Sequence, residues 1–494
     1  MNVLNYLEHA ANTYPNRIAI REESGELTYE VFRKQARTLG LFLMEKGFCH
    51  TNKPIGVLAE RKATTLILFM GILYSGNFYV PLDPEMKQEK RNRIIADSGM
   101  ELILSAKDVE EALSRTWNPE EVNKAWDFVE DAPLYVVYTS GSTGVPKGVL
   151  KTHGAMSDYV EAFSKAYPYE DHEVLGNQTP FFFDASAKDL YLMLKHAATL
   201  VIIPTSLFSF PVKLVEFMNQ TEISIISWVP SALSLLSQLN VFADVVPTTL
   251  KKVFFVGEVF PMKQLNKWRK AMPHLLYVNL YGSSEIAGIC LYYEVKKEDV
   301  FEDAQVLPMG KALSNCHIVL MDQEKNVPVT ETGVSGEIYL SSKALAAEYY
   351  KDEEKTKNSF FEADLDGSGI RRYFKTGDVA YYNEDGNLVF ASRKDFQIKH
   401  MGHRIELGEI EVAASALDYV AKSGCIYDSD KRRIVLYCEY VPGCDMTTAQ
   451  TKAELTERLS SYMVPSRVVA IPQMPLNANG KIDRMKLKEI YNTK

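Results

Sequence analysis

A loop rich in glycine, hydroxyl and lysine residues is the first part of the sequence that could carry chemistry. It reads YTSGSTGVPKG from Tyr138 to Gly148 and follows the apolar run Leu134 to Tyr138, whose aromatic and β-branched residues indicate a buried strand. Glycine lets backbone N–H groups approach phosphate oxygens, hydroxyl groups donate hydrogen bonds, and Lys147 supplies a positive charge. The loop is therefore expected to bind the phosphates of a nucleotide.

Two better-known motifs do not fit this loop. A Walker P-loop requires GxxxxGK[ST], whereas here the lysine precedes Gly148. A nucleophile elbow requires GxSxG, and position 140, two residues before Ser142, is serine. The remaining alternative is a flexible Gly/Ser linker, although linkers rarely follow a buried strand and end in Pro-Lys-Gly.

Two further stretches place a carboxylate after a strand. Asn279 to Glu285 reads NLYGSSE, where an aromatic ring could stack on a purine and a carboxylate beside phosphates could hold magnesium. Tyr373 to Val379 reads YFKTGDV, and Asp378 could accept both hydroxyls of a ribose. Each signal is weak alone, because a polar turn after a strand is common and a turn aspartate often bonds its own backbone.

Two stretches could position charged groups against a substrate. In FFFDAS, Asp184 stands at the start of a predicted helix, where it could cap the helix or bind an ammonium group; Lys188 lies on the same helical face. Lys188 could form a salt bridge or be solvated, although the neighbouring apolar residues suggest a partly buried face. In NGKIDR, Lys481 stands on an Asn-Gly turn, which by itself indicates only a hairpin.

Composition limits the possible classes of function. The 494 residues are 46% apolar and 24% charged, as in a soluble globular protein with a large core. The formal charge of -9 argues against general nucleic-acid binding. No apolar run approaches the roughly 18 residues of a membrane span, and the start has no basic segment followed by an apolar one. The six cysteines show no metal-binding spacing, so we expect reduced thiols in the cytoplasm.

Strand and helix patterns alternate through the first three hundred residues. The clearest are a helix from LTYEVF to about Gly47, a buried helix over Ala63 to Tyr74, a helix over Ala185 to His196 and a strand over Leu276 to Tyr281. Beyond about Pro308, short strands and glycine turns follow. We predict an α/β fold with a large N-terminal domain of helix-flanked sheets, residues 1–394, and a small mobile C-terminal α+β domain, residues 395–494.

In this order the segments resemble the adenylate-forming superfamily, which includes peptide-synthetase adenylation domains, D-alanine:carrier-protein ligases, acyl-CoA and aryl-CoA synthetases and luciferases. GEIYL, SRKDFQIKHMGHRIELGEIE and SYMVP extend the match over nearly the whole chain. The last part favours the amino-acid-activating branch. The resemblance implies ATP-dependent formation of an acyl-adenylate, followed by transfer of the acyl group to the phosphopantetheine thiol of a carrier protein.

The resemblance also implies roles for individual residues. Thr139 to Lys147 would contact the ATP phosphates, Glu285 would hold Mg²⁺, and Lys481 would bridge the substrate carboxylate and the forming phosphate ester. Asp395 matches the hinge about which the small domain rotates. Lys147, Glu285, Thr143 and Lys481 would be catalytic. The other expected nucleotide-binding residues are Thr139, Ser140, Gly141, Ser142, Gly144, Gly257, Glu258, Asn279, Leu280, Tyr281, Gly282, Ser283, Ser284, Asp378 and Arg393.

Three places depart from the family pattern. Ser284 replaces a threonine and keeps the hydroxyl group. Ser392 replaces the glycine before Arg393, which puts the local turn in question. The stretch SSKALAAEYY, from Ser341 to Tyr350, lacks the usual glycines, so we expect a different surface loop there.

The substrate prediction rests on Asp184, which matches the position that binds the α-ammonium in amino-acid-activating members. A lysine among apolar walls requires an anion, so Lys188 suggests an acidic amino acid such as glutamate. The same alignment gives a side-chain pocket lined by Lys188, Val256, Leu280, Gly288 and Ile289, with Ser227 or Trp228 and Phe254 as further candidates.

The sequence is also compatible with another substrate and with other functions. D-alanine for teichoic acid is the main alternative substrate, and an acyl-CoA or aryl-CoA ligase is the nearest rival enzyme. A relative without catalytic activity would not need Lys147, Glu285, Asp378 and Lys481 together. Because only ten residues follow NGKIDR, we expect a separate carrier protein as partner, with no nucleic acid and no membrane insertion.

Overall fold

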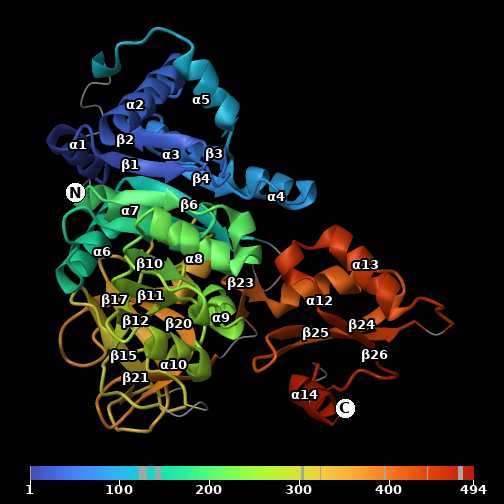
Figure 1. The fold of residues 1–494 in the computed structure, drawn as a ribbon. Coiled ribbons are helices and arrows are strands. Elements are labelled where there is room, and N and C mark those ends of the chain that lie inside the picture. The colour runs from blue at the N-terminus through green and yellow to red at the C-terminus, as the bar shows by residue number, and fades with distance from the viewer. Residues whose placement is uncertain are drawn as a thin grey trace. The chain divides into compact units, whose positions relative to one another are not determined.

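The computed structural model describes residues 2–121, 131–139, 146–301, 305–322, 324–393, 397–441, 443–476 and 482–493. The chain divides into two compact units, drawn as a ribbon in Figure 1. The larger comprises residues 1–84, 95–138 and 148–394, and the smaller comprises residues 85–94, 139–147 and 395–494. The expected fold class, α/β with a large N-terminal domain and a smaller C-terminal domain, is confirmed.

The largest sheet of the larger unit has nine strands. Their order is β14-β13-β12-β11-β10-β8-β9-β1-β2. Neighbours among β8 to β12 pair in parallel, as do β1 and β9, whereas β2, β13 and β14 are antiparallel additions at the two ends. The strands are β1 Ile18–Glu22, β2 Gly25–Thr28, β8 Val174–Asn177, β9 Thr199–Ile202, β10 Ile225–Trp228, β11 Lys252–Val256, β12 Leu276–Tyr281, β13 Leu291–Val295 and β14 Lys311–Ala312.

Helices cover both faces of this sheet, because apolar side chains alternate along its central strands. Phe254 and Leu280 belong to one core with side chains of α6 and α7, whereas Phe255 and Tyr277 belong to a second core with α8, α9 and α10. The strands therefore separate two apolar layers. The helices are α6 His153–Ala166, α7 Asp184–His196, α8 Pro211–Gln220, α9 Pro230–Gln238 and α10 Met262–Ala271.

A six-stranded sheet, in the order β18-β7-β6-β4-β3-β5, lies next to the N-terminal helices. Helix α3 is apolar on all sides and is buried accordingly. A Cβ at Gly71 would meet Leu39 of α2 at 2.5 Å, so glycine permits the close packing of α2 on α3. The elements are α1 Leu4–Thr13, α2 Tyr29–Glu45, β3 Pro54–Leu58, α3 Ala63–Tyr74, β4 Phe78–Leu82, α4 Gln88–Ser98, β5 Ile103–Leu104, α5 Ala106–Leu113, β6 Pro133–Thr139, β7 Lys147–Thr152 and β18 Glu348–Tyr349.

A third sheet is wholly antiparallel and carries the YFKTGDV segment. Its path is β16-β15-β17-β20-β19, with β21 also paired to β20. Ser392 lies within β21 opposite Val379, so its substitution falls in a strand and not in a turn. The elements are β15 Cys316–Met321, β16 Pro328–Val329, β17 Gly336–Ser342, α11 Glu353–Ser359, β19 Phe360–Ala363, β20 Arg371–Tyr382 and β21 Leu388–Arg393.

The C-terminal part has its own three-stranded sheet, β24-β25-β26, and a hairpin of β22 and β23. Side chains of α12 and α13 form one core against the sheet, and Leu487 of α14 joins a second core with Ile426, Val435 and Tyr437. The elements are β22 Gln397–His400, β23 His403–Glu406, α12 Leu407–Ser415, β24 Val420–Asp428, β25 Arg433–Tyr440, α13 Thr448–Arg458, β26 Arg467–Ala470 and α14 Arg484–Asn492.

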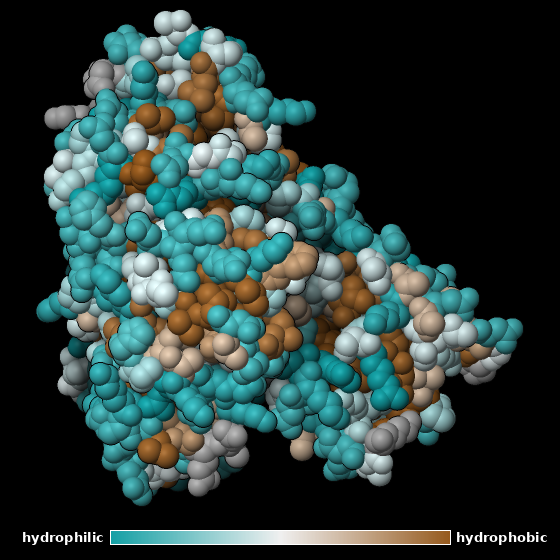
Figure 2. Space-filling model, viewed as in Figure 1, coloured by the Kyte–Doolittle hydropathy of each residue, from teal (hydrophilic) through white to brown (hydrophobic). Residues whose placement is uncertain are grey.

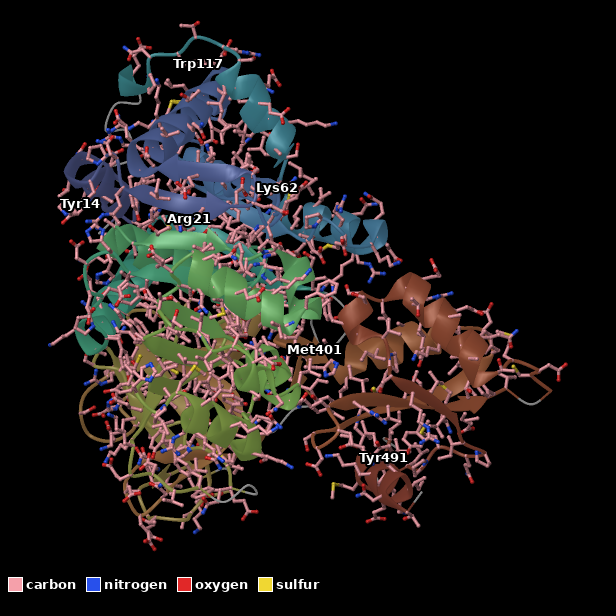
Figure 3. The ribbon with its side chains drawn as sticks, in the orientation of Figure 1. Tyr14, Arg21, Lys62, Trp117, Met401 and Tyr491 are labelled. Carbon is pink, nitrogen blue, oxygen red and sulfur yellow. The ribbon has the colours of Figure 1, made fainter. Side chains whose placement is uncertain are left out.

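The face of the molecule in Figure 2 is mainly hydrophilic, with apolar side chains gathered around α8 and α9. Exposed apolar residues of this region include Phe210 and Leu239. Side chains fill the space between the layers (Figure 3). Trp117, labelled there, donates its indole N–H to the carbonyl of Ala112 at the end of α5, at 2.9 Å. Within the described ranges, no helix is both long enough and apolar enough to span a membrane.

Candidate active site

The two ends of the predicted phosphate loop belong to neighbouring strands. Thr139 ends β6 and Lys147 begins β7, and these strands are adjacent in the six-stranded sheet. The hydroxyl of Thr139 is buried and has no hydrogen-bond partner within the described part of the chain. The remaining loop residues of the prediction, Ser140, Gly141, Ser142, Thr143 and Gly144, lie outside the described residues, as do Asp395 and Lys481.

Glu285 is a fully buried carboxylate at the end of the NLYGSSE segment. Its Oε1 accepts a hydrogen bond of 2.7 Å from the hydroxyl of Tyr349 in β18. Its backbone carbonyl accepts from the N–H of Ala346 at 2.8 Å, and Ala344, Leu345 and Ala346 are all buried. The SSKALAAEYY stretch is therefore not the surface loop that we expected, because it packs behind Glu285 and fixes that carboxylate.

Asp378 is the centre of a buried polar cluster. Its carboxylate accepts a hydrogen bond from the Tyr281 hydroxyl and one of 2.7 Å from Arg393, which is its register partner on β21. The Asp378 N–H donates to Thr376 Oγ1 at 3.1 Å. Burial, followed by the Asp378 charge, raises the pKa of Tyr281 well above its ordinary value, so that the phenol stays protonated. Tyr281, Asp378 and Arg393, predicted from separate motifs, are thus brought together.

Other predicted nucleotide-binding residues have structural partners. The Asn279 amide donates to the Pro308 carbonyl at 2.7 Å. Glu258 accepts from the N–H of Ser231 at 2.9 Å, in the first turn of α9, and Gly257 has a positive φ of 97°. By contrast, the Ser283 hydroxyl is buried without a hydrogen-bond partner in the described ranges. A donor that is buried without a partner is costly unless a ligand meets it.

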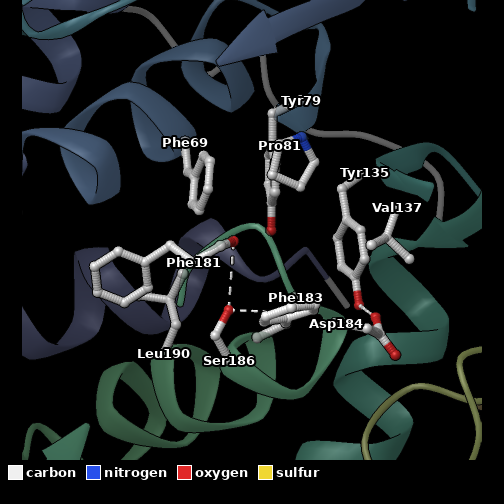
Figure 4. A pocket seen from close by; sticks show the side chains of 11 residues that line it. Phe69, Tyr79, Pro81, Tyr135, Val137, Phe181, Phe183, Asp184, Ser186 and Leu190 are labelled. Atoms are coloured by element: carbon white, nitrogen blue, oxygen red, sulfur yellow. Dashed lines mark hydrogen bonds between the residues drawn. The ribbon is translucent and has the colours of Figure 1, made fainter. Parts of the chain in front are cut away.

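Asp184 supplies the single carboxylate of a pocket lined largely by apolar and aromatic side chains (Figure 4). It is the first residue of α7, and its Oδ1 accepts a hydrogen bond of 2.7 Å from the Tyr135 hydroxyl of β6. Ser186 donates to the Phe183 carbonyl at 2.8 Å and so supports the turn that leads into the helix. The pocket is lined by Phe69, Tyr79, Pro81, Tyr135, Val137, Phe181, Phe183, Asp184, Ser186, Ala187 and Leu190.

Lys188 has its counter-ion within the chain. Its Nζ lies 2.7 Å from Asp189 Oδ1, and both side chains are buried. Lys188 is also absent from the lining of the pocket in Figure 4. The anion that a buried lysine needs is therefore Asp189, and Lys188 no longer argues for an acidic substrate.

The other residues predicted to line a side-chain pocket lie in the core and not in the pocket of Figure 4. Leu280 and Ile289 are buried, Val256 packs against the same core, and Gly288 adjoins the ring of Tyr159. The two alternative candidates on β10 are Ser227 and Trp228. Trp228 belongs to the core that the sheet shares with α8, α9 and α10. Since side chains alternate along β10, Ser227 lies on the opposite face, where it is the register neighbour of Phe254.

Gly288→Ala is expected to destabilise the protein by roughly 2–5 kcal/mol, as the sum of backbone strain and overpacking. Gly288 has a φ of 68°, and an added Cβ would lie 2.2 Å from the Tyr159 ring. Urea unfolding followed by tryptophan fluorescence measures this, because Trp228 and Trp268 are buried in the larger unit. Gly367→Ala is the matched control, with a φ of 78° and no atom within 4 Å of the added Cβ. Equal losses in the two variants would show that the contact with Tyr159 costs nothing.

Lys151, in β7, is a buried lysine that the sequence analysis did not single out. Its Nζ has no hydrogen-bond partner within the described part of the chain. Burial lowers the pKa of Lys151 to about 8, although the charges of Asp184 and Glu285 act in the opposite direction. A lysine within the apolar run of a strand was the only signal in the sequence. Tyr135, Tyr349 and Asp189 were also missed, because their roles depend on contacts that the sequence patterns do not reveal.

Two family models match the chain. The model described as AMP-binding enzyme matches residues 7–350, and the model described as AMP-binding enzyme C-terminal domain matches residues 409–481. Together they cover the segments that carry Asp184, Glu285 and the C-terminal sheet.

The chain is also similar to individual proteins. It is 30% identical to a D-alanine--D-alanyl carrier protein ligase of Bacillus cytotoxicus, over 99% of each chain. It is 28% identical to tyrocidine synthase 1 of Brevibacillus parabrevis over 98% of its own length, and it spans only 44% of that relative. Among solved structures, the adenylation domain AlmE of Vibrio cholerae, in complex with glycyl-adenosine-5'-phosphate, has the same fold, with a TM-score of 0.85 over 100% of this chain and 98% of that chain, at 18% identity.

Proposed function

The chain belongs to the AMP-binding enzyme family, and from this premise we propose that it activates an amino acid with ATP and passes it to a carrier protein. In the first step a carboxylate oxygen of the amino acid attacks the α-phosphorus, the bond to the bridging oxygen breaks, and pyrophosphate leaves. In the second step the phosphopantetheine thiol loses its proton and attacks the carbonyl carbon, so that a thioester forms and AMP leaves.

The observation that carries this proposal is the Asp184 carboxylate in its largely aromatic pocket. An ammonium group entering such a pocket loses its hydration and needs an opposite charge. Asp184 offers that charge, and the hydrogen bond of 2.7 Å from Tyr135 holds the carboxylate in one orientation. Amino acids are therefore better candidates for the substrate than fatty or aryl acids, which have no group to pair with Asp184.

The residues present fit a bound nucleotide. The ribose hydroxyls would bond to Asp378, whose carboxylate is held by Tyr281 and Arg393. The buried hydroxyls of Thr139 and Ser283, which lack partners in the described ranges, would meet phosphate oxygens. Lys147 and the loop residues Ser140 to Gly144 would add further phosphate contacts. Asn279 and the Tyr281 ring would adjoin the adenine.

A magnesium ion would be held by Glu285 together with the phosphates. No group of three or more His, Cys, Asp or Glu side chains suited to a metal occurs among the residues that the structure describes. Mg²⁺ in nucleotide sites is usually bound by one or two carboxylates plus phosphate oxygens, and the fixed Glu285 carboxylate fits that arrangement. Bound there, the ion would neutralise charge on the phosphates.

Within the class of amino acids, both acidic and small neutral substrates are candidates. Since Asp189 pairs with Lys188, glutamate keeps no advantage over a small neutral amino acid. The D-alanine ligase of Bacillus cytotoxicus, matched over 99% of both chains, supports D-alanine as an alternative substrate. The carrier protein proposed as partner is supported by the same relative. A cytoplasmic location is supported by the six cysteines, none of which forms a disulfide.

ATP–pyrophosphate exchange over a panel of L- and D-amino acids and simple carboxylic acids tests the proposal. We expect exchange with one or a few amino acids and little with acids that lack an amino group. Loading of a phosphopantetheinylated carrier protein with the preferred amino acid tests the second step. Exchange with amino-free acids together with CoA turnover would instead establish an acyl-CoA or aryl-CoA ligase.

A further inference from the structure

Lys151 is a buried cation for which the fold supplies no partner among the described residues. Its side chain is completely excluded from solvent, and no described residue accepts a hydrogen bond from its Nζ. An unpaired buried ammonium is costly to the folded state. The buried pair of Lys188 with Asp189 shows how this chain neutralises a buried charge when the charge serves structure. The stability of the fold therefore does not explain why a lysine is buried at position 151.

The strand pairing fixes the direction in which Lys151 points. A Cβ at Gly148 would lie 2.9 Å from Val136 and 3.1 Å from Tyr138, so Gly148 faces these even-numbered residues of β6. Side chains alternate along a strand, so Val149 and Lys151 lie on the other face, with Tyr135 and Val137. Tyr135 and Val137 line the pocket of Figure 4. Lys151 thus lies on the pocket face of the sheet, beside the residues that line the pocket and not among them.

The neighbouring strand on the other side gives the same result. Tyr349 of β18 is the register partner of Val149, and directly opposed residues share a face. β7 lies between β18 and β6. On this face, the Tyr349 hydroxyl holds Glu285 and the Tyr135 hydroxyl holds Asp184. Lys151 is therefore flanked by the two strands whose tyrosines orient the two carboxylates, and both carboxylates act electrostatically on it.

We propose that Lys151 binds the reacting carboxylate of the substrate, between the ammonium at Asp184 and the α-phosphate next to Glu285. This inference rests on the proposed function. In an α-amino acid the carboxylate and the ammonium are attached to the same carbon, so a substrate anchored at Asp184 keeps its carboxylate close to that side chain. Lys151 is a cation on β7, between the two strands whose tyrosines hold Asp184 and Glu285, and is placed to receive this carboxylate.

This role differs from that of Lys481. Lys481 comes from the C-terminal segment, whereas Lys151 belongs to a sheet of the larger unit. Lys151 would therefore hold the carboxylate before the attack on phosphorus and the acyl oxygen after it. A purely electrostatic role, in which Lys151 only offsets the charges of Asp184 and Glu285, would make no distinction between ligands with and without a carboxylate.

Lys151→Met tests the proposal, because methionine preserves length and removes the charge. The acid that the wild-type chain activates best in the exchange panel is compared with its alcohol, which keeps the rest of the molecule and lacks the carboxylate. Calorimetry should show the affinity of the variant for the acid lowered at least about tenfold and its affinity for the alcohol within about twofold of wild type. kcat/KM in pyrophosphate exchange should fall by roughly 10²-fold. Equal losses for acid and alcohol, or unchanged binding of the acid, would overturn the proposal.

The thermal unfolding midpoint provides a second test, because a structural role for Lys151 predicts the opposite change in that midpoint. Lys151→Met should leave the thermal unfolding midpoint of the ligand-free protein unchanged or higher, because it removes a buried unpaired charge. Lys188→Met is the matched control and should lower the midpoint, because it leaves Asp189 buried without its partner. A comparable fall in both variants would indicate that Lys151 serves folding.

Different results would contradict the proposed function and the carboxylate-binding role of Lys151. If the wild-type chain activates an acid without an amino group, the proposed function is wrong, and the Lys151 comparison still applies to that acid and its alcohol. If the wild-type chain activates an amino acid and Lys151→Met retains full activity and affinity, only the carboxylate role is wrong. A wild-type chain that activates no carboxylic acid contradicts both.

Discussion

Asp184→Asn is expected to lower kcat/KM for the amino acid substrate by roughly 10²–10³-fold, because the variant leaves the substrate ammonium without its counter-charge inside an apolar pocket. Asparagine has nearly the same shape, so the fold should be preserved. Its side-chain oxygen can still accept the hydrogen bond from Tyr135 that the wild-type carboxylate accepts at 2.7 Å. The loss should therefore come from the charge and not from packing.

A deaminated analogue separates the charge effect from a general loss of activity. We expect the variant to activate the acid that lacks the α-amino group about as well as the wild-type chain does, so that the preference for the amino acid collapses. Tyr135→Phe is the matched control: it removes the donor that orients Asp184 and keeps the carboxylate, and its effect should be about tenfold. If Asp184→Asn lowers exchange with both acids to the same extent, Asp184 does not bind the ammonium.

Lys481→Ala is expected to reduce adenylate formation by at least roughly 10³-fold while leaving thioester formation from supplied aminoacyl-adenylate within a few-fold of wild type. The physical reason is that charge develops on the phosphate ester only in the first step, where a lysine at that place stabilises the transition state. In the second step, rotation of the C-terminal domain about Asp395 would bring the carrier thiol into the site in place of Lys481.

Single-turnover measurements of the two steps check this separation. Pyrophosphate release reports the first step, and loading of a carrier protein from synthetic aminoacyl-adenylate reports the second. Lys486→Ala is the control, since Lys486 is an exposed lysine in the neighbouring helix α14. Parallel loss of both steps in Lys481→Ala would contradict the domain-rotation account.

Local sequence patterns predicted much of the fold. The expected helix Ala63 to Tyr74 and the expected strand Leu276 to Tyr281 coincide with α3 and β12, and α7 begins one residue before the expected Ala185. Such elements are specified by the periodicity of their own side chains. Helix α6, His153–Ala166, was not expected.

The site was less accessible to sequence reasoning, because it depends on pairs of residues far apart in the chain. Asp184, Glu285 and Asp378 were singled out from the sequence as site candidates, whereas the tyrosines that orient Asp184 and Glu285 come from β6 and β18 and were not. Lys188 shows the limit most clearly. A partly buried position and a need for an anion were expected, and the side chain is buried, but the anion is the next residue, Asp189. Helix periodicity predicts the face on which a residue lies, but it does not predict that a long lysine side chain will reach the carboxylate of the adjacent residue.

The alternation of side chains along β7 has a consequence for how this segment could change in length. Insertion of one residue directly after Gly148, with the pairing to β6 and β18 retained, would exchange the faces of Leu150 and Lys151. A leucine would then take the place of the lysine on the pocket face, and the lysine would lie on the opposite face with Val136 and Tyr138. A length change of one residue in this part of β7 would therefore keep Lys151 on its face only where a β-bulge absorbs it.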